Sequence, residues 1–211
     1  MKLNKKQIKQ IDDFLEIRKI KYLDIKVELL DHLATDFEEN SNDSFLEDYL
    51  SSKGNFVSDF AKKQQKTIHW TYQKQLWIEF AKFFYKPKLL ILLFGLIGLG
   101  YLFLSFFNLK EFGFVCYFVL LILVFYPLLY QMKYYKAIKK VQSMQSLFTV
   151  TSLPSVLLHS SLLTRDLFEE YSLLIIVYWF FSLLLGLSAV IIIEKDREKV
   201  LEKYYQLINR E

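Results

Sequence analysis

Four residues with side chains able to bind a metal or exchange protons recur along one segment at the spacing of a helix face. They are Glu28, Asp31, His32 and Asp36, at i, i+3, i+4 and i+8. A carboxylate and an imidazole one helical turn apart could bind a metal, as in di-metal helical bundles. Such sites need a second helix with a matching Glu-x-x-His pair, and the sequence has none. We therefore expect a solvated acidic face, and a metal site at Glu28, His32 and Asp36 stays the alternative.

A second chemical candidate lies in an apolar part of the chain. His159 falls within the run 144–163, which also contains Pro154. An ionisable group inside a membrane is a functional candidate, because burying charge in lipid is costly. A neutral imidazole beside serines can instead form a local hydrogen bond. A small membrane enzyme or transporter that uses His159 with Glu169 or Glu170 therefore remains an alternative.

Catalytic signatures are absent from the sequence. It has no Gly-x-Ser-x-Gly, no phosphate-binding glycine loop ending in Gly-Lys-Ser/Thr, no His-Glu-x-x-His and no Cys-x-x-Cys. Its single cysteine, Cys116, cannot form a disulfide within the chain. We expect a non-enzymatic protein with no catalytic residues and no cofactor.

The elements that position these residues are predicted by the distribution of apolar residues. Hydrophobic residues make up 53% of the 211-residue chain and concentrate in its second half. Leu89–Leu109 carries no charge, and a helix of this length spans roughly 30 Å, the thickness of a hydrocarbon core. Further apolar runs follow, so the sequence predicts four transmembrane helices, at about 89–109, 112–132, 144–163 and 171–193.

The predicted fold class is an all-α integral membrane protein. A small cytosolic helical domain, 1–61, precedes a basic aromatic helix, 62–88, and a four-helix transmembrane bundle, 89–193. A charged helical tail, 194–211, follows the bundle. Lysines concentrate at the N-terminus, in the loop 133–140 and in the tail. By the positive-inside rule, this distribution predicts a bacterial inner-membrane protein with both termini on the cytoplasmic side.

The N-terminal domain is predicted to contain an amphipathic helix over YLDIKVELLDHLATDFEEN. Its wheel places apolar residues on one side and an acidic face on the other, including Asp24. Lys26 falls on the apolar side, where its stem could lie along apolar neighbours while the ammonium reaches water. We expect the acidic face to bind a protein partner through Glu28, Asp31, His32, Asp36 and Glu39.

The segment 62–88 reverses the charge balance and carries aromatic residues at helical spacing. This pattern is typical of a helix that lies in the membrane interface, with lysines beside anionic headgroups. The expected interface residues are Lys66, Trp70, Lys74, Trp77, Phe80, Phe84, Lys86 and Lys88.

The stretch VELLDHLATDFEE carries a resemblance, through Glu28, Leu29, Asp31, His32 and Leu33. It resembles the N-terminal helical module of small uncharacterised membrane proteins of Bacteroidetes and, more loosely, the HAAS-type signalling domain and the permease-prefix domain. Such modules precede membrane spans and are often encoded beside PadR-type transcription regulators. The resemblance covers about the first 60 residues and implies a membrane-anchored regulatory or sensory role.

The expected function is therefore membrane-anchored signalling or regulation. An accessory subunit of a membrane transporter is the alternative. The expected partners are the anionic headgroups of a lipid bilayer and a protein that binds the N-terminal domain, and self-association into a homo-oligomer stays open. No nucleic-acid partner is expected, because the lysine-rich segments carry no recognisable nucleic-acid-binding fold and lie beside apolar runs.

Overall fold

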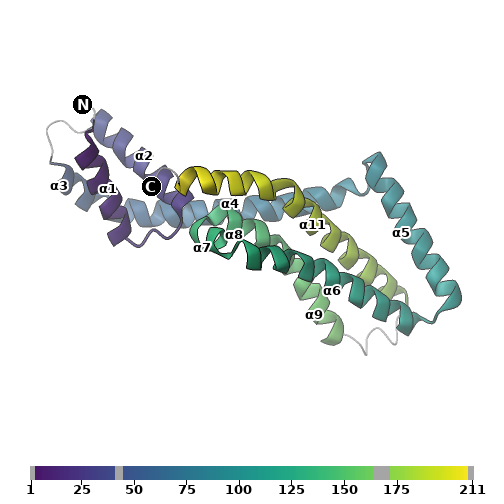
Figure 1. Ribbon diagram of the computed structural model, residues 1–211. Helices are drawn as coiled ribbons and strands as arrows, with labels where there is room; N and C mark the ends of the chain where they lie inside the picture. Colours follow the sequence, from purple (N-terminus) through teal and green to yellow (C-terminus); the bar gives the residue numbers. More distant parts are fainter. Residues whose placement is uncertain (1–2, 41–44, 164–171, 209–211) are drawn as a thin grey trace. The chain divides into compact units, whose positions relative to one another are not determined.

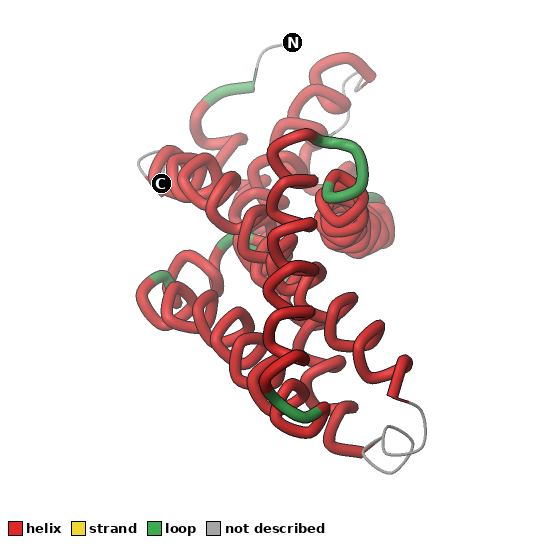
Figure 2. The backbone as a smooth tube through the Cα atoms, turned by 90° about the vertical axis from the view of Figure 1, so that its right-hand side faces the viewer, coloured by secondary structure: helices red, strands yellow, loops and turns green. Residues whose placement is uncertain are grey.

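The computed structural model describes residues 3–40, 45–163 and 172–208, and every regular element in these ranges is a helix. The prediction of an all-α protein is confirmed for the described residues, which contain no strand (Figures 1 and 2). The helices are α1 Lys5–Ile17, α2 Leu23–Asn40, α3 Leu46–Ser52, α4 Gly54–Lys82, α5 Pro87–Phe106, α6 Leu109–Lys133, α7 Tyr135–Lys140, α8 Gln142–Phe148, the 3₁₀ turn η1 Thr149–Thr151, α9 Ser152–Leu163 and α11 Ser172–Ile208.

The chain divides into two compact units, each built from separate stretches of sequence. The first unit combines Met1–Trp70 with Tyr135–Ser146 and Lys199–Glu211. The second unit combines Thr71–Tyr134 with Leu147–Glu198. The first unit thus contains the N-terminal helices, all of α7, the start of α8 and the last turns of α11.

Apolar side chains of α1 to α4 form the core of the first unit. Its fully buried members include Ile11 and Leu15 on α1 and Val57 on α4. A capping box begins α1: the Asn4 side chain accepts from the Gln7 backbone N–H, and the Gln7 side chain accepts from the Asn4 N–H. These two bonds satisfy backbone donors that a helix N-terminus otherwise leaves without partners.

The buried face of α2 differs from the predicted one at two charged residues. Ile25, Leu29 and Leu33 recur at four-residue spacing and are buried, as an amphipathic helix requires. Asp24, predicted on the solvated acidic face, is also buried, so this prediction was wrong. Lys26 does not extend into water either, since its ammonium pairs with two carboxylates of α1.

Those carboxylates are Asp12, at 2.8 Å from Lys26 Nζ, and Glu16, at 3.1 Å. Burial disfavours the charged lysine, but the hydrogen bonds and charges of the two carboxylates outweigh it and raise the pKa of Lys26. Lys26 therefore stays protonated and links α2 to α1 through these ion pairs.

Three helices of the described chain are long and apolar enough to cross a membrane. They are α5, α6 and the part of α11 from Leu174 to Ile208. The predicted span 112–132 lies within α6, and the described part of 171–193 lies within α11. The predicted span 89–109 corresponds to α5 but continues three residues past its end at Phe106. α11 continues to Ile208 without a break, so the predicted tail begins inside a helix.

The predicted third span, 144–163, does not form one continuous helix. It is divided among the end of α8, the turn η1 and α9. α9 has 12 residues, which corresponds to about 18 Å, well short of a hydrocarbon core. The segment contains Pro154 and several Ser and Thr residues, which compete with regular helix formation.

Within the second unit, α6 and α11 approach each other closely at a glycine. A Cβ atom at Gly186 of α11 would lie 3.1 Å from side-chain carbons of Leu120 and Leu123 on α6. Ser182, one turn earlier, is buried, and its hydroxyl donates to its own helix at Tyr178 O, 2.7 Å away. The small pair Ser182 and Gly186 thus lies at a point of helix contact, as small-xxx-small pairs in membranes commonly do.

Candidate functional site

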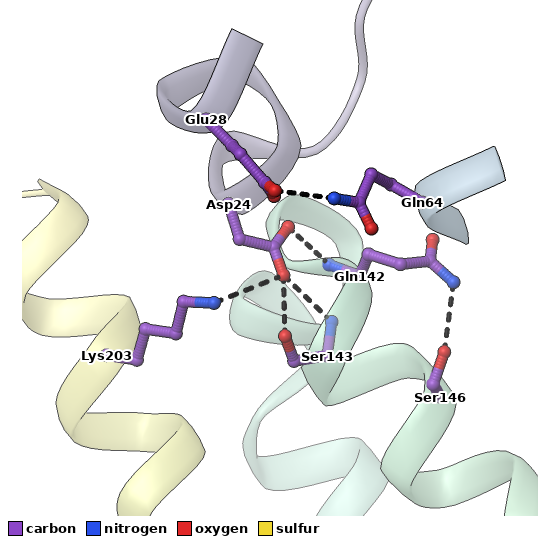
Figure 3. A network of polar contacts seen from close by, with 7 residues as sticks. All are labelled: Asp24, Glu28, Gln64, Gln142, Ser143, Ser146 and Lys203. Atoms are coloured by element: carbon purple, nitrogen blue, oxygen red, sulfur yellow. Dashed lines mark hydrogen bonds and ion pairs between the residues drawn. The ribbon is translucent and has the colours of Figure 1, made fainter. Parts of the chain in front are cut away.

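A buried carboxylate near the start of α2 joins three distant parts of the sequence within the first unit. The Asp24 side chain is 1% exposed. It accepts hydrogen bonds from the backbone N–H of Gln142 and of Ser143, both at 3.0 Å, and from the Ser143 hydroxyl at 2.6 Å. The ammonium of Lys203, on α11, lies 4.0 Å from the same carboxylate (Figure 3).

This geometry is that of a helix cap supplied by a different helix. Gln142 and Ser143 are the first residues of α8, whose N–H groups have no partner within that helix. A carboxylate at a helix N-terminus satisfies these donors and interacts favourably with the partial positive charge there. Tyr22 adds a second link between the same elements, because its hydroxyl donates to the side chain of Gln145.

A cleft opens beside Asp24 between α2 and the end of α11. Its volume is about 290 Å³, and its lining residues are Asp24, Val27, Glu28, Asp31, Lys203, Gln206 and Leu207. Glu28 accepts a hydrogen bond from the amide of Gln64 on α4 (Figure 3). With three carboxylates and one ammonium, the lining carries a formal charge of −2. The cleft is therefore suited to a cationic group.

The five predicted partner-binding residues do not form one surface cluster. Glu28 and Asp31 both line the cleft. The His32 ring packs edge-on against Phe60, with centroids 5.1 Å apart. Glu39 is exposed near the end of α2 and is not among the lining residues.

Asp36, the remaining member, takes part in a separate ion-pair network. Its carboxylate lies 2.7 Å from Lys53 Nζ and accepts from the Tyr49 hydroxyl at 2.5 Å and the Asn40 amide at 2.8 Å. These donors, Lys53 first, lower the pKa of Asp36 to about 2. Since Glu28, His32 and Asp36 have different neighbours, they do not converge, and no group of three metal-binding side chains occurs among the described residues.

The expected interface residues span α4, the link after it and the start of α5. Trp70, Trp77 and Phe84 expose 60%, 48% and 53% of their surface. Lys66, Lys74, Lys86 and Lys88 are exposed as well. Phe80 packs instead against Phe181 of α11, with ring centroids 5.2 Å apart. The helix that carries most of this set begins at Gly54, eight residues before the predicted start at 62.

His159 lies on α9 and is exposed, whereas Pro154 is buried. The Nδ1 atom of His159 lies 2.7 Å from the carbonyl oxygen of Ser155, one turn earlier. Because a carbonyl only accepts, Nδ1 is the donor in this contact. Glu169 and Glu170, the carboxylates considered as partners of His159, lie outside the described residues.

Sequence reasoning placed Asp24 on a solvated face and assigned no role to Gln142, Ser143 or Lys203. The contacts of Asp24 with α8 join residues 118 and 119 positions apart. Helical periodicity reports only on neighbours three or four positions apart and could not reveal these contacts. The available signal was the polar pair Gln142 and Ser143, which follows the lysine-rich segment after one residue, Val141.

Comparison of the chain with protein-family models, curated proteins and solved structures gives no match. The resemblance of the first 60 residues to helical signalling modules therefore stays a prediction.

Proposed function

We propose that this chain is a non-enzymatic, membrane-anchored regulatory or signalling protein whose N-terminal helical domain contacts a protein partner. The observation that carries the proposal is the binding of Asp24 to Gln142 and Ser143. These residues lie nine and ten positions after the end of α6, one of the three apolar helices. The N-terminal domain is thereby attached to the start of α8, which follows a helix that we take to cross the membrane. A partner that binds this domain would change the contact between Asp24 and α8.

The cleft beside Asp24 is the proposed contact surface for the partner. Glu28 and Asp31 give it negative charge, while Val27 and Leu207 give it an apolar lining. A basic side chain of the partner, on a helix or an extended segment, would complement both properties.

The proposed topology has four membrane crossings with both termini in the cytoplasm. It is supported by the way the first unit is assembled from three separate stretches of sequence. Because these stretches pack into one compact unit, they must lie on the same side of a bilayer. α5 and α6 take the chain across and back, and α11 crosses once more before Lys199. A further crossing is then needed, and we assign it to 144–163, where the end of α8, the turn η1 and α9 follow one another without a gap.

Reporter fusions test this topology. A reporter active only in the cytosol is expected to give signal when fused after Gln142 and after Glu211, and none after Glu111. A C-terminal reporter active only on the outer side would contradict the fourth crossing.

Site-specific photo-cross-linking tests the protein contact. A photoreactive residue is placed at Asp31 or Gln206, both on the cleft, and at the exposed Lys9 on α1 as a control. Cross-linking in native cells is expected to join a regulatory or signalling protein to the cleft positions and not to Lys9. A transporter component in the same adduct would favour the accessory-subunit alternative, and the absence of any protein adduct would contradict the proposal.

The adduct should depend on charge if the cleft binds a basic side chain. The double substitution Glu28→Gln with Asp31→Asn is expected to reduce its yield, and so is added salt. The same pair of charge removals at Asp13 and Glu47, which are exposed and do not line this cleft, is the matched control.

A further inference from the structure

The short helix α7 has one buried and one basic, aromatic side. Ala137 is 2% exposed, and Val141, directly after the helix, is fully buried. Tyr135 exposes 56% of its surface, and Lys136, Lys139 and Lys140 are exposed. The ammonium of Lys139 lies 4.4 Å from the centre of the Tyr135 ring, so an aromatic ring and a cation form one surface.

Chain connectivity keeps this surface beside the end of an apolar helix. α6 ends at Lys133 and α7 begins at Tyr135. Two steps of about 3.8 Å therefore separate the start of α7 from the end of a helix long enough to cross the membrane. Tyrosine and lysine are the residues that favour the headgroup layer, where an amphipathic ring and a charged head are both accommodated.

The segment around α7 also carries no negative charge of its own. No Asp or Glu occurs from Phe112 to Arg165. A cluster of lysines at the end of a membrane helix attracts anionic lipids. Each lysine near the membrane surface raises the preference for an anionic over a neutral lipid about fivefold.

We propose that the exposed face of α7, formed by Tyr135, Lys136, Lys139 and Lys140, binds the headgroups of anionic lipids such as phosphatidylglycerol. This inference goes beyond the proposed function and does not require a protein partner. It adds a lipid contact distinct from the residues 66–88 expected at the interface. Val141 alone separates this face in the chain from Gln142 and Ser143, whose backbone N–H groups donate to Asp24.

A lipid-specific photo-cross-link at α7 tests the proposal. The full chain, with a photoreactive residue in place of Tyr135, is reconstituted in nanodiscs that contain phosphatidylglycerol and phosphatidylcholine in equal amounts. Mass spectrometry then gives the ratio of the two lipid adducts. The expected ratio is about fivefold or more in favour of phosphatidylglycerol.

Three charge variants identify the cause of any preference. K136Q/K139Q/K140Q is expected to bring the ratio close to one, whereas K136R/K139R/K140R keeps it. K5Q/K6Q/K9Q removes the same charge from exposed positions on α1 and is expected to leave it unchanged.

Added salt offers a test on the unmodified lysines, because an electrostatic preference falls as ionic strength rises. Equal adducts from the two lipids, a preference retained in the glutamine variant, or a preference independent of salt would each overturn the proposal.

Discussion

Removal of the Asp24 carboxylate is the sharpest perturbation that the structure offers. Asp24→Ala leaves three donors without their acceptor: the N–H groups of Gln142 and Ser143 and the Ser143 hydroxyl. A hydrogen bond to a charged group contributes about 1.5–3 kcal/mol, and a buried donor without a partner costs about 1–3 kcal/mol. The three bonds share one carboxylate and are not additive, so we expect a total loss of about 3–5 kcal/mol.

Asp24→Asn should cost less, because the amide keeps one oxygen as an acceptor. Its NH₂ group, however, faces a donor and cannot accept. We expect a loss of about 1–3 kcal/mol for this variant. Asp31→Ala, on the same helix but exposed, is the matched control and should change stability by less than about 0.5 kcal/mol.

Amide hydrogen exchange of the full chain in detergent or nanodiscs measures this effect at the donors themselves. A loss of 3 kcal/mol corresponds to exchange on the order of 100-fold faster at Gln142 and Ser143, provided that α8 opens locally. The α1 amides near Ile11 and Leu15 serve as an internal reference. Exchange at Gln142 and Ser143 that stays within threefold of wild type in Asp24→Ala would refute the capping role.

Three further predictions concern packing, acidity and His159. Gly186→Ile should weaken the contact of α11 with α6 by about 1–3 kcal/mol, measured by thermal unfolding in detergent, whereas Gly95→Ile, where a Cβ meets nothing within 4 Å, should not. The pKa of Asp36 is lowered to about 2 by Lys53 and its other donors, so its stabilisation is present above about pH 4 and is lost as pH falls toward 2. Because Asp36 is partly exposed, this contributes on the order of 1 kcal/mol, and Asp36→Asn should flatten the acid limb of an unfolding curve followed by circular dichroism. His159→Gln should leave membrane insertion and phenotype near wild type, and loss of function with normal insertion would favour the transport or enzyme alternative.

Helix type and the strongest apolar spans could be predicted from sequence because they depend on local properties. The capping box at Asn4 and Gln7 needs two residues three positions apart. The apolar helices α5 and α6 need only an uninterrupted run of apolar residues. In both cases the determining interactions lie within one helix, so the pattern along the chain contains the information.

The interior of the first unit could not be predicted in the same way. Asp24 and Lys26 are charged, and sequence reasoning assigns a charged group to water unless a partner is known. Their partners lie on other elements: Gln142 and Ser143 on α8, and Asp12 on α1. Burial of a charged side chain is stable only with such partners, so the sequence around α2 alone favoured the wrong environment.

The same physical reason bears on how the first unit could respond to a signal. The stability of an apolar core changes little when a charge nearby changes. The contact of one carboxylate with two N–H groups and a hydroxyl depends strongly on local electrostatics. Lys203 lies 4.0 Å from that carboxylate and also lines the cleft proposed for a cationic partner. A partner's cation in the cleft would repel Lys203 and compete for Asp24. A cation that bound the carboxylate a few kcal/mol more tightly than the N–H groups of Gln142 and Ser143 do would break the contact of Asp24 with α8. If the cleft acts in this way, Lys203→Gln should tighten partner binding while it weakens the protection of the α8 amides only slightly.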